Sequence, residues 1–176
     1  VEAPGCVVVD HRDIPGRNCI AMIEADEPCL VESEVRHQEE PILLLAHEDR
    51  EKLLDAKVEI EYEPGTPVFD AEQSTVEFKK VAVEKGDLAK GFAEAELVVE
   101  GEYRVPLQEH VYIETNGVIA VPEGDMMTVY GSLQCPYYVH KSLCVLLGTD
   151  QVRVVQVETG GGFGGKEEYP SVLACH

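Results

Sequence analysis

The chain has 176 residues, of which 44% are hydrophobic, and this content suffices to bury a core in one or two small domains. Its 34 acidic and 14 basic residues give a formal net charge of −20 at pH 7, so nucleic acids and anionic membrane surfaces are not expected as partners. The sequence has neither an apolar run near the ~20 residues that cross a bilayer nor a leader-like start, which predicts a soluble, cytoplasmic protein.

The cysteines form no recognisable metal-binding or disulfide pattern, because no two of the six are spaced as C-x-x-C. We therefore expect reduced thiols, most of them small core residues, and no metal bound by protein side chains. The six are Cys6, Cys19, Cys29, Cys135, Cys144 and Cys175.

The N-terminal part of the chain has the pattern of a small α/β unit. Residues 7–9 favour a short strand, and the continuous apolar run at 42–46 is typical of a buried strand. Residues 47–57 have the apolar spacing of a short surface helix, with Asp49 as its N-cap. Apolar and acidic side chains then alternate over 58–62, which predicts a half-exposed strand.

A linker is predicted at 64–67, where two prolines and a glycine interrupt any regular element. It separates a small domain, residues 1–63, from a second domain, residues 68–176. In the second domain, residues 87–95 predict a short helix capped by its aspartate, and the alternation over 97–105 predicts a strand.

From residue 108 onward the pattern is strongly β-like. Two strands are predicted at 111–121 and 126–132, joined by a four-residue hairpin connection at 122–125. A helix is predicted over 136–147, because proline stands at its first position and Gly148 stands just past its end.

The segment Thr159–Glu168, here called the glycine loop, follows a predicted strand at 152–158 and precedes a predicted helix start at 170–174. It contains five glycines around a single phenylalanine. Because glycine has no Cβ, such a loop presents backbone N–H groups closely to a bound group. A strand, a glycine loop and a helix start together favour binding of an anion or an oxygen-rich cofactor.

Gln134 and Cys135 lie in a second strand-to-helix connection. If the strands before the two connections are neighbours, both connections open onto one surface, where ligands of a sheet tend to bind.

Other interpretations of the glycine loop stay open. Gly160, Gly162 and Gly165 fit G-x-G-x-x-G, but the acidic residue expected about 20 positions later is missing. Lys166 completes G-x-x-x-x-G-K, but Glu167 stands where a P-loop needs serine or threonine, and a carboxylate there would repel phosphates, so a P-loop is rejected. The alternatives are a non-catalytic dinucleotide- or anion-binding module and an acidic interaction domain with a tight, ligand-free turn. A nucleophile and base formed by Cys135 with His110 or His140 is a further alternative that no spacing supports.

Several motifs together resemble the molybdenum-binding portion of the xanthine dehydrogenase and aldehyde oxidase family. They are Gln108–Glu114, Gly131–Pro136 and Gly160–Glu167. Segments of the N-terminal unit are similar to the small hammerhead domain of these enzymes, namely Asp26–Pro28, Pro41–Ala46 and Val58–Pro64. The resemblance implies an α+β fold: a small α/β hammerhead domain followed by the first part of a mixed α/β molybdopterin-binding domain.

The resemblance also implies a molybdopterin cofactor whose molybdenum has no direct protein ligand. Gln134 takes the place of a glutamine that bonds a metal-bound oxygen and acts in catalysis. The cofactor-binding backbone corresponds to Gly161, Gly162, Phe163 and Gly164. Electrons are expected to leave through 2Fe-2S clusters and FAD on other domains or subunits of an oligomeric enzyme.

The expected reaction is hydroxylation of a purine such as xanthine, or of a related N-heterocycle, with oxygen from water. Glu167 takes the place of a carboxylate that orients the purine, and aldehyde oxidation is the alternative within the family. His37–Pro41 departs from the family pattern, and Cys135 with Glu168–Pro170 resembles a bacterial selenium-dependent subgroup. Because the family's general base lies further along the chain, we expect this chain to be an excised piece that is inactive alone.

Overall fold

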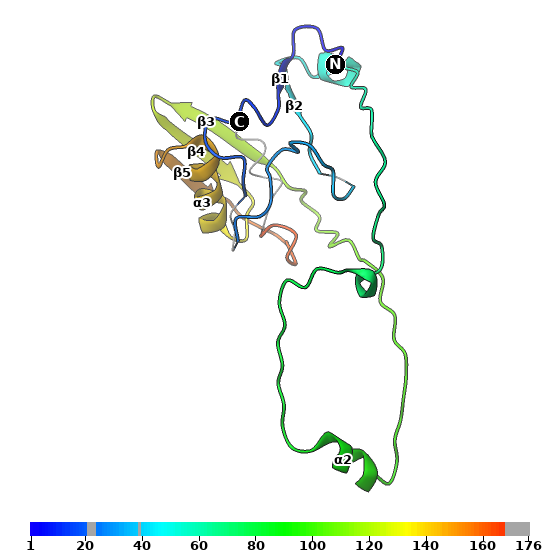
Figure 1. The fold of residues 1–176 in the computed structure, drawn as a ribbon. Helices are drawn as coiled ribbons and strands as arrows, with labels where there is room; N and C mark the ends of the chain where they lie inside the picture. Colours follow the sequence, from blue (N-terminus) through cyan, green and yellow to red (C-terminus); the bar gives the residue numbers. More distant parts are fainter. Residues whose placement is uncertain (21–23, 39, 168–176) are drawn as a thin grey trace. The chain divides into compact units, whose positions relative to one another are not determined.

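A three-stranded sheet forms the centre of the described fold, with the strand order β3-β4-β5 (Figure 1). Its strands are β3 (Val118–Glu123), β4 (Met126–Gly131) and β5 (Val152–Gln156). The first two strands pair antiparallel, whereas β4 and β5 pair parallel. The computed structural model describes residues 1–20, 24–38 and 40–167.

The β3–β4 hairpin is tighter than predicted. Glu123 pairs with Met126, so only two residues lie in the turn, and Gly124 adopts a φ of 64° there. The expected four-residue connection is wrong, because Pro122 belongs to β3, a strand at the edge of the sheet where a missing N–H is tolerated. The predicted strand from residue 111 is also wrong before Val118, where the ladder begins.

Helix α3 (Pro136–Leu147) connects the two parallel strands and confirms the predicted bounds. Proline occupies its first turn, and Gly148 ends it in the left-handed region with a φ of 65°.

Apolar side chains of α3, β4 and β5 form one buried cluster with residues from the N-terminal segment. Its members are Ile14, Ile20, Cys29, Leu30, Val129, Leu133, Val139, Leu143, Leu146 and Val152.

The N-terminal segment binds the C-terminal end of α3. The N–H groups of Gly16 and Arg17 donate to the carbonyls of Leu146 and Val145, at 2.7 and 2.9 Å. These carbonyls belong to the last turn of the helix, which has no further helical N–H groups to bond. The small unit at the start of the chain is therefore continuous with the core around α3.

A second, two-stranded sheet pairs β1 (Val7–Val9) with β2 (Leu44–Ala46) in antiparallel register. Both predicted strands form, but the prediction that the second is buried is wrong: its residues are half-buried or exposed. Helix α1 (Arg50–Asp55) follows, and the Asp49 side chain accepts from the N–H of Glu51 as predicted.

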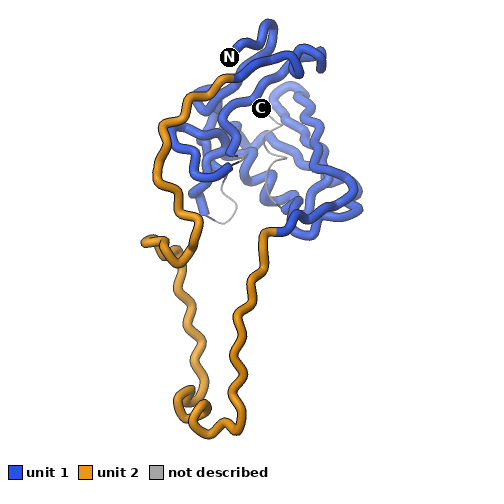
Figure 2. Tube along the Cα trace, turned by 90° about the vertical axis from the view of Figure 1, so that its right-hand side faces the viewer, with its two compact units in different colours: residues 1–58, 108–176 blue, residues 59–107 orange. Residues whose placement is uncertain are grey.

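The chain divides into two compact units (Figure 2). Unit 1 comprises Val1–Val58 and Gln108–His176, and unit 2 comprises Glu59–Leu107. Both helices and strands are present in unit 1, which confirms the α+β class. The predicted linker at 64–67 lies within unit 2, and its role as a domain boundary stays a prediction.

Unit 2 consists of extended chain with two short helical segments (Figure 2). These are the 3-10 turn η1 (Ala71–Gln73) and helix α2 (Leu88–Glu94), which begins after Asp87 as predicted. The strands expected at 58–62 and 97–105 do not form. Both stretches have the alternation of a strand, but no neighbouring strand among the described residues supplies the backbone hydrogen bonds that a stable sheet requires.

The contact between the N-terminal segment and α3 predicts a strong effect of Gly16→Ala. An added Cβ would lie 2.2 Å from the Val145 oxygen and 2.6 Å from the Gly148 nitrogen, both of them backbone atoms. The segment must move away and lose its two hydrogen bonds, at a cost of about 1–3 kcal/mol for each carbonyl left unpaired. Amide hydrogen exchange of residues 16 and 17 in the intact protein should accelerate.

Gly65→Ala is the matched control, since a Cβ at that position meets nothing within 4 Å. Equal exchange at residues 16 and 17 in both variants would show that the contact contributes nothing to local stability.

Candidate functional site

The parallel pairing of β4 with β5 places Gln134 against the glycine loop. The Gln134 Oε1 accepts from the N–H groups of Gly164 and Lys166, at 3.0 and 3.2 Å. The backbone N–H of Gln134 donates to the Lys166 carbonyl at 2.8 Å. The prediction that the two connections meet on one surface is therefore confirmed.

The backbone of the glycine loop is held in an unusual conformation. A Cβ on Gly162 would lie 2.2 Å from the Gln134 Oε1, so only glycine fits beside that carboxamide. Phe163 and Gly164 have φ angles of 50° and 96°. A bulky side chain at positive φ is strained, and such strain is found where a ligand needs a particular backbone geometry. The Phe163 side chain is 75% exposed, so core packing does not account for it.

Alternate residues between 110 and 116 face the glycine loop. The Glu114 Oε1 accepts from the N–H of Gly161 at 2.8 Å, and the Tyr112 hydroxyl donates to the Gly165 carbonyl at 3.3 Å. Asn116 Nδ2 contacts the same carbonyl at 3.4 Å. Side chains therefore alternate here as they would in the predicted strand, although the backbone ladder does not form before Val118.

The Lys166 side chain is completely buried on the inner side of the loop. Its Nζ donates to the Ser132 Oγ at 3.0 Å and lies 3.3 Å from the Glu114 Oε1. It also lies 4.7 Å from the centre of the Tyr112 ring, within the range of a cation–π interaction. In a P-loop the lysine would extend to a bound phosphate, so the direction of this side chain argues against that interpretation.

The Glu114 carboxylate is strongly favoured in its ionised form. Hydrogen bonds from its own backbone N–H and that of Gly161, together with the Lys166 ammonium, lower the pKa of Glu114 from 4.5 to about 2. Neither the role of Glu114 nor the burial of Lys166 was predicted. Glu114 is the last residue of the family-like motif Gln108–Glu114, which was the available signal for it.

The remaining predicted site residues are distributed as follows. Glu167 is exposed at the end of the loop, and its N–H donates to the Gly164 carbonyl at 3.4 Å. The helix start predicted at 170–174 lies outside the described residues. His140 contacts the Val152 carbonyl at 3.1 Å, and His110 lies beside the loop at Gly164, so neither contact involves Cys135.

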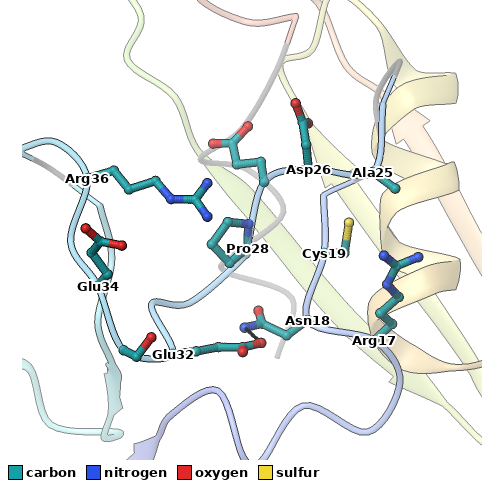
Figure 3. Close-up of a pocket in the computed structure, with 11 residues that line it drawn as sticks. Arg17, Asn18, Cys19, Ala25, Asp26, Pro28, Glu32, Glu34 and Arg36 are labelled. Atoms are coloured by element: carbon teal, nitrogen blue, oxygen red, sulfur yellow. Dashed lines mark hydrogen bonds between the residues drawn. The ribbon is translucent and has the colours of Figure 1, made fainter. Parts of the chain in front are cut away.

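A separate polar pocket of about 340 Å³ lies in the N-terminal segment (Figure 3). Its charged lining comprises Arg17, Asp26, Glu27, Glu32, Glu34 and Arg36. Asn18 also lines it and acts structurally, because its side chain pairs with the backbone N–H and carbonyl of Leu30 at 3.0 and 2.7 Å. The glycine loop does not contribute to this pocket.

Within the described residues, no group of three or more histidine, cysteine, aspartate or glutamate side chains is placed to hold a metal ion. The part of the chain that is described also contains no helix long and apolar enough to span a membrane.

The loop leaves donors available for an oxygen-rich ligand. In the described structure, the N–H groups of Gly162 and Phe163 and the Gln134 Nε2 have no hydrogen-bond partner. Gly162 is itself buried, where an unpaired N–H is costly. These three donors lie close together, because Gln134 accepts from Gly164 within the same loop. The donor set fits a cofactor rich in oxygen atoms.

Comparison with known proteins agrees with this geometry. A model of the molybdopterin cofactor-binding domain matches residues 68–176. The chain is 31% identical to the nicotinate dehydrogenase large molybdopterin subunit of Eubacterium barkeri, over 96% of this chain and 43% of that protein. It is 35% identical to xanthine dehydrogenase of Dictyostelium discoideum, over 99% of this chain and 14% of that protein. It is 31% identical to a probable xanthine dehydrogenase subunit from Bacillus subtilis, over 95% of this chain and 25% of that protein.

The chain therefore belongs to the family of molybdopterin cofactor-binding domains found in molybdenum hydroxylases, which confirms the predicted resemblance. It spans less than half the length of these three relatives.

The lowered pKa of Glu114 predicts that the loop loosens in acid. A carboxylate with a depressed pKa in the folded state contributes stability above its ordinary pKa of 4.5, and this contribution is lost as the pH falls toward about 2. Lys166 and the loop N–H groups are the polar groups that face it. Exchange of the Gly161 amide, corrected for its intrinsic pH dependence, should therefore accelerate across this window.

Glu114→Gln keeps an oxygen that accepts from Gly161 and does not titrate. If wild type and Glu114→Gln respond equally to acid, another carboxylate controls the loop.

Proposed function

We propose that the protein containing this chain is a molybdenum hydroxylase and that the glycine loop with Gln134 binds its molybdopterin cofactor. The observation that supports this most directly is the set of unpaired donors at Gly162, Phe163 and Gln134. Family membership and the names of the relatives agree with it.

Each part of the loop has a task in this proposal. The N–H groups of Gly162 and Phe163 donate to cofactor oxygens, and the Gln134 Nε2 donates to another. None of the described side chains would ligate the molybdenum in this proposal. When bound, the cofactor supplies a two-electron oxidation in which oxygen from water is added to a substrate carbon. The residues of this chain bind and orient the reacting groups and donate hydrogen bonds where negative charge develops.

Gln134→Ala in the intact enzyme tests this role. Removing one positioned donor should lower kcat on the order of 10²-fold, by comparison with the loss of an oxyanion donor. Because Gln134 also holds Gly164 and Lys166, the molybdenum content must be measured in the same samples. Unchanged turnover at full molybdenum content would remove Gln134 from the mechanism.

Gln151→Ala is a suitable control, since Gln151 lies on the surface next to Asp150 and away from the loop.

Iron and flavin analysis of the same preparations tests the proposed electron path through 2Fe-2S clusters and FAD on other parts of the enzyme. Absence of both would refute that path.

We propose purines such as xanthine, or related N-heterocycles, as substrates. Two of the three relatives described above carry the name xanthine dehydrogenase, and the third is named for nicotinate, also a nitrogen heterocycle. Glu167 is exposed at the end of the same loop as the donors of Gly162 and Phe163, and its N–H donates to the Gly164 carbonyl. We propose that its carboxylate accepts from ring N–H groups, which an aldehyde lacks.

Glu167→Val should therefore lower kcat/KM for xanthine or hypoxanthine relative to an aromatic aldehyde. Leaving a polar partner unpaired costs about 1–3 kcal/mol, which corresponds to roughly 5- to 150-fold in this ratio. Both substrates are measured on wild type and variant at equal molybdenum content. A ratio that does not fall would favour the aldehyde alternative.

The N-terminal unit is proposed to be a hammerhead domain, on the basis of its motifs. A cytoplasmic location is proposed from the acidic charge and from the lack of any C-x-x-C spacing among the six cysteines. Modification of the partly exposed thiols of Cys6 and Cys135 in intact cells by a membrane-permeant reagent, but not by an impermeant one, would agree with that location.

A further inference from the structure

The ammonium of Lys166 is buried on the inner side of the glycine loop. The proposed function assigns it no task. Its Nζ contacts Ser132 at 3.0 Å and Glu114 at 3.3 Å, and the side chain is 0% exposed. We infer that Lys166 and Glu114 form an ion pair that positions the glycine loop, so that its free N–H groups face the cofactor. This inference rests on the proposed function of the loop.

Lys166 links the two connections that follow β4 and β5. Its backbone N–H and carbonyl both bond to Gln134, at 3.2 and 2.8 Å. Its side chain reaches Ser132, two residues earlier in the same connection as Gln134, and also contacts Glu114. The residue that ends the glycine repeat is thus held by both its backbone and its side chain.

Glu114 holds the other end of the repeat. Its Oε1 accepts from Gly161, and a Cβ on Gly160 would lie 2.9 Å from the same oxygen. The loop is therefore held at Gly161 by Glu114 and at Gly164 by Gln134. The two N–H groups without partners in the described structure, those of Gly162 and Phe163, lie between these fixed points. Glu114 of the ion pair therefore holds the backbone at the residue before these two donors, and Gln134 holds it at the residue after them.

Charge, and not only side-chain volume, is needed for this arrangement. The Glu114 side chain is 38% exposed, but Lys166 is completely buried, so its ammonium depends on Glu114, Ser132 and the Tyr112 ring for stabilisation. Removing Glu114 alone would leave the buried ammonium uncompensated, which costs more than removing both charges. The lowered pKa of Glu114 agrees with a carboxylate that stays ionised beside the ammonium.

The test compares Lys166→Met and Glu114→Gln in the intact enzyme with an exposed pair on helix α2. Methionine retains an unbranched stem without the charge. Lys90→Met and Glu94→Gln are the controls, because this pair spans 3.8 Å and each side chain is 67% exposed. Amide exchange of segment 160–167 and molybdenum content are measured in every sample.

We expect exchange of this segment to accelerate about 10-fold or more in Glu114→Gln, which leaves the buried ammonium without its counter-ion, and less in Lys166→Met, with molybdenum content reduced in both. The control variants should leave both measurements unchanged. If Lys166→Met does not fold, Glu114→Gln alone decides: unaltered exchange in that variant overturns the inference.

The double variant Lys166→Met/Glu114→Gln separates charge from packing. It removes both charges and retains an oxygen that accepts from Gly161, so its loop should exchange more slowly than that of Glu114→Gln. If the double variant exchanges as fast as Glu114→Gln, the uncompensated ammonium is not the cause of the faster exchange, and the inference is overturned.

Failure of the proposed function gives a different result. Accelerated exchange with full molybdenum content and unchanged turnover per molybdenum would show that the loop does not bind the cofactor, and would overturn the positioning role with it. Unaltered exchange would overturn the ion pair's role alone, and the Gln134→Ala test would still stand.

Discussion

The parallel pairing of β4 with β5 is the constraint on which the rest of the site depends. Because both strands run in the same direction, the connections that follow them leave from the same edge of the sheet. Gln134 then lies within hydrogen-bond distance of the glycine loop, 30 residues later in the chain. Helix α3 makes this pairing possible, since parallel neighbours need a long crossover.

The electrostatics of the site are unusual for a glycine loop. The chain carries a formal net charge of −20, yet a lysine of the glycine loop is completely buried. The ammonium is compensated by Glu114 and does not extend toward the ligand side, as a P-loop lysine would. The loop thus presents neutral backbone donors to the ligand, and the charged groups hold the backbone in place. This arrangement suits a large cofactor contacted at many oxygen atoms more than a single phosphate group.

Unit 2 shows what the alternation of apolar side chains leaves undetermined. Residues 97–105 have the side-chain pattern of a strand, but in the structure they are extended and exposed. A strand gains stability only when a neighbouring strand pairs with it and one face is covered. The alternation therefore shows that this stretch favours a β-strand, but no strand among the described residues pairs with it.

Local signals in the sequence were enough to predict α3, the N-caps Asp49 and Asp87, strand β5 and the glycine loop, because each depends on residues within a few positions of one another. The pairing of Gln134 with the loop was predicted only on the condition that the two strands are neighbours. The burial of Lys166, the role of Glu114 and the late start of β3 at Val118 were decided by tertiary structure. Each of these depends on contacts between residues far apart in the chain, and such contacts leave no mark in the local pattern of residue types.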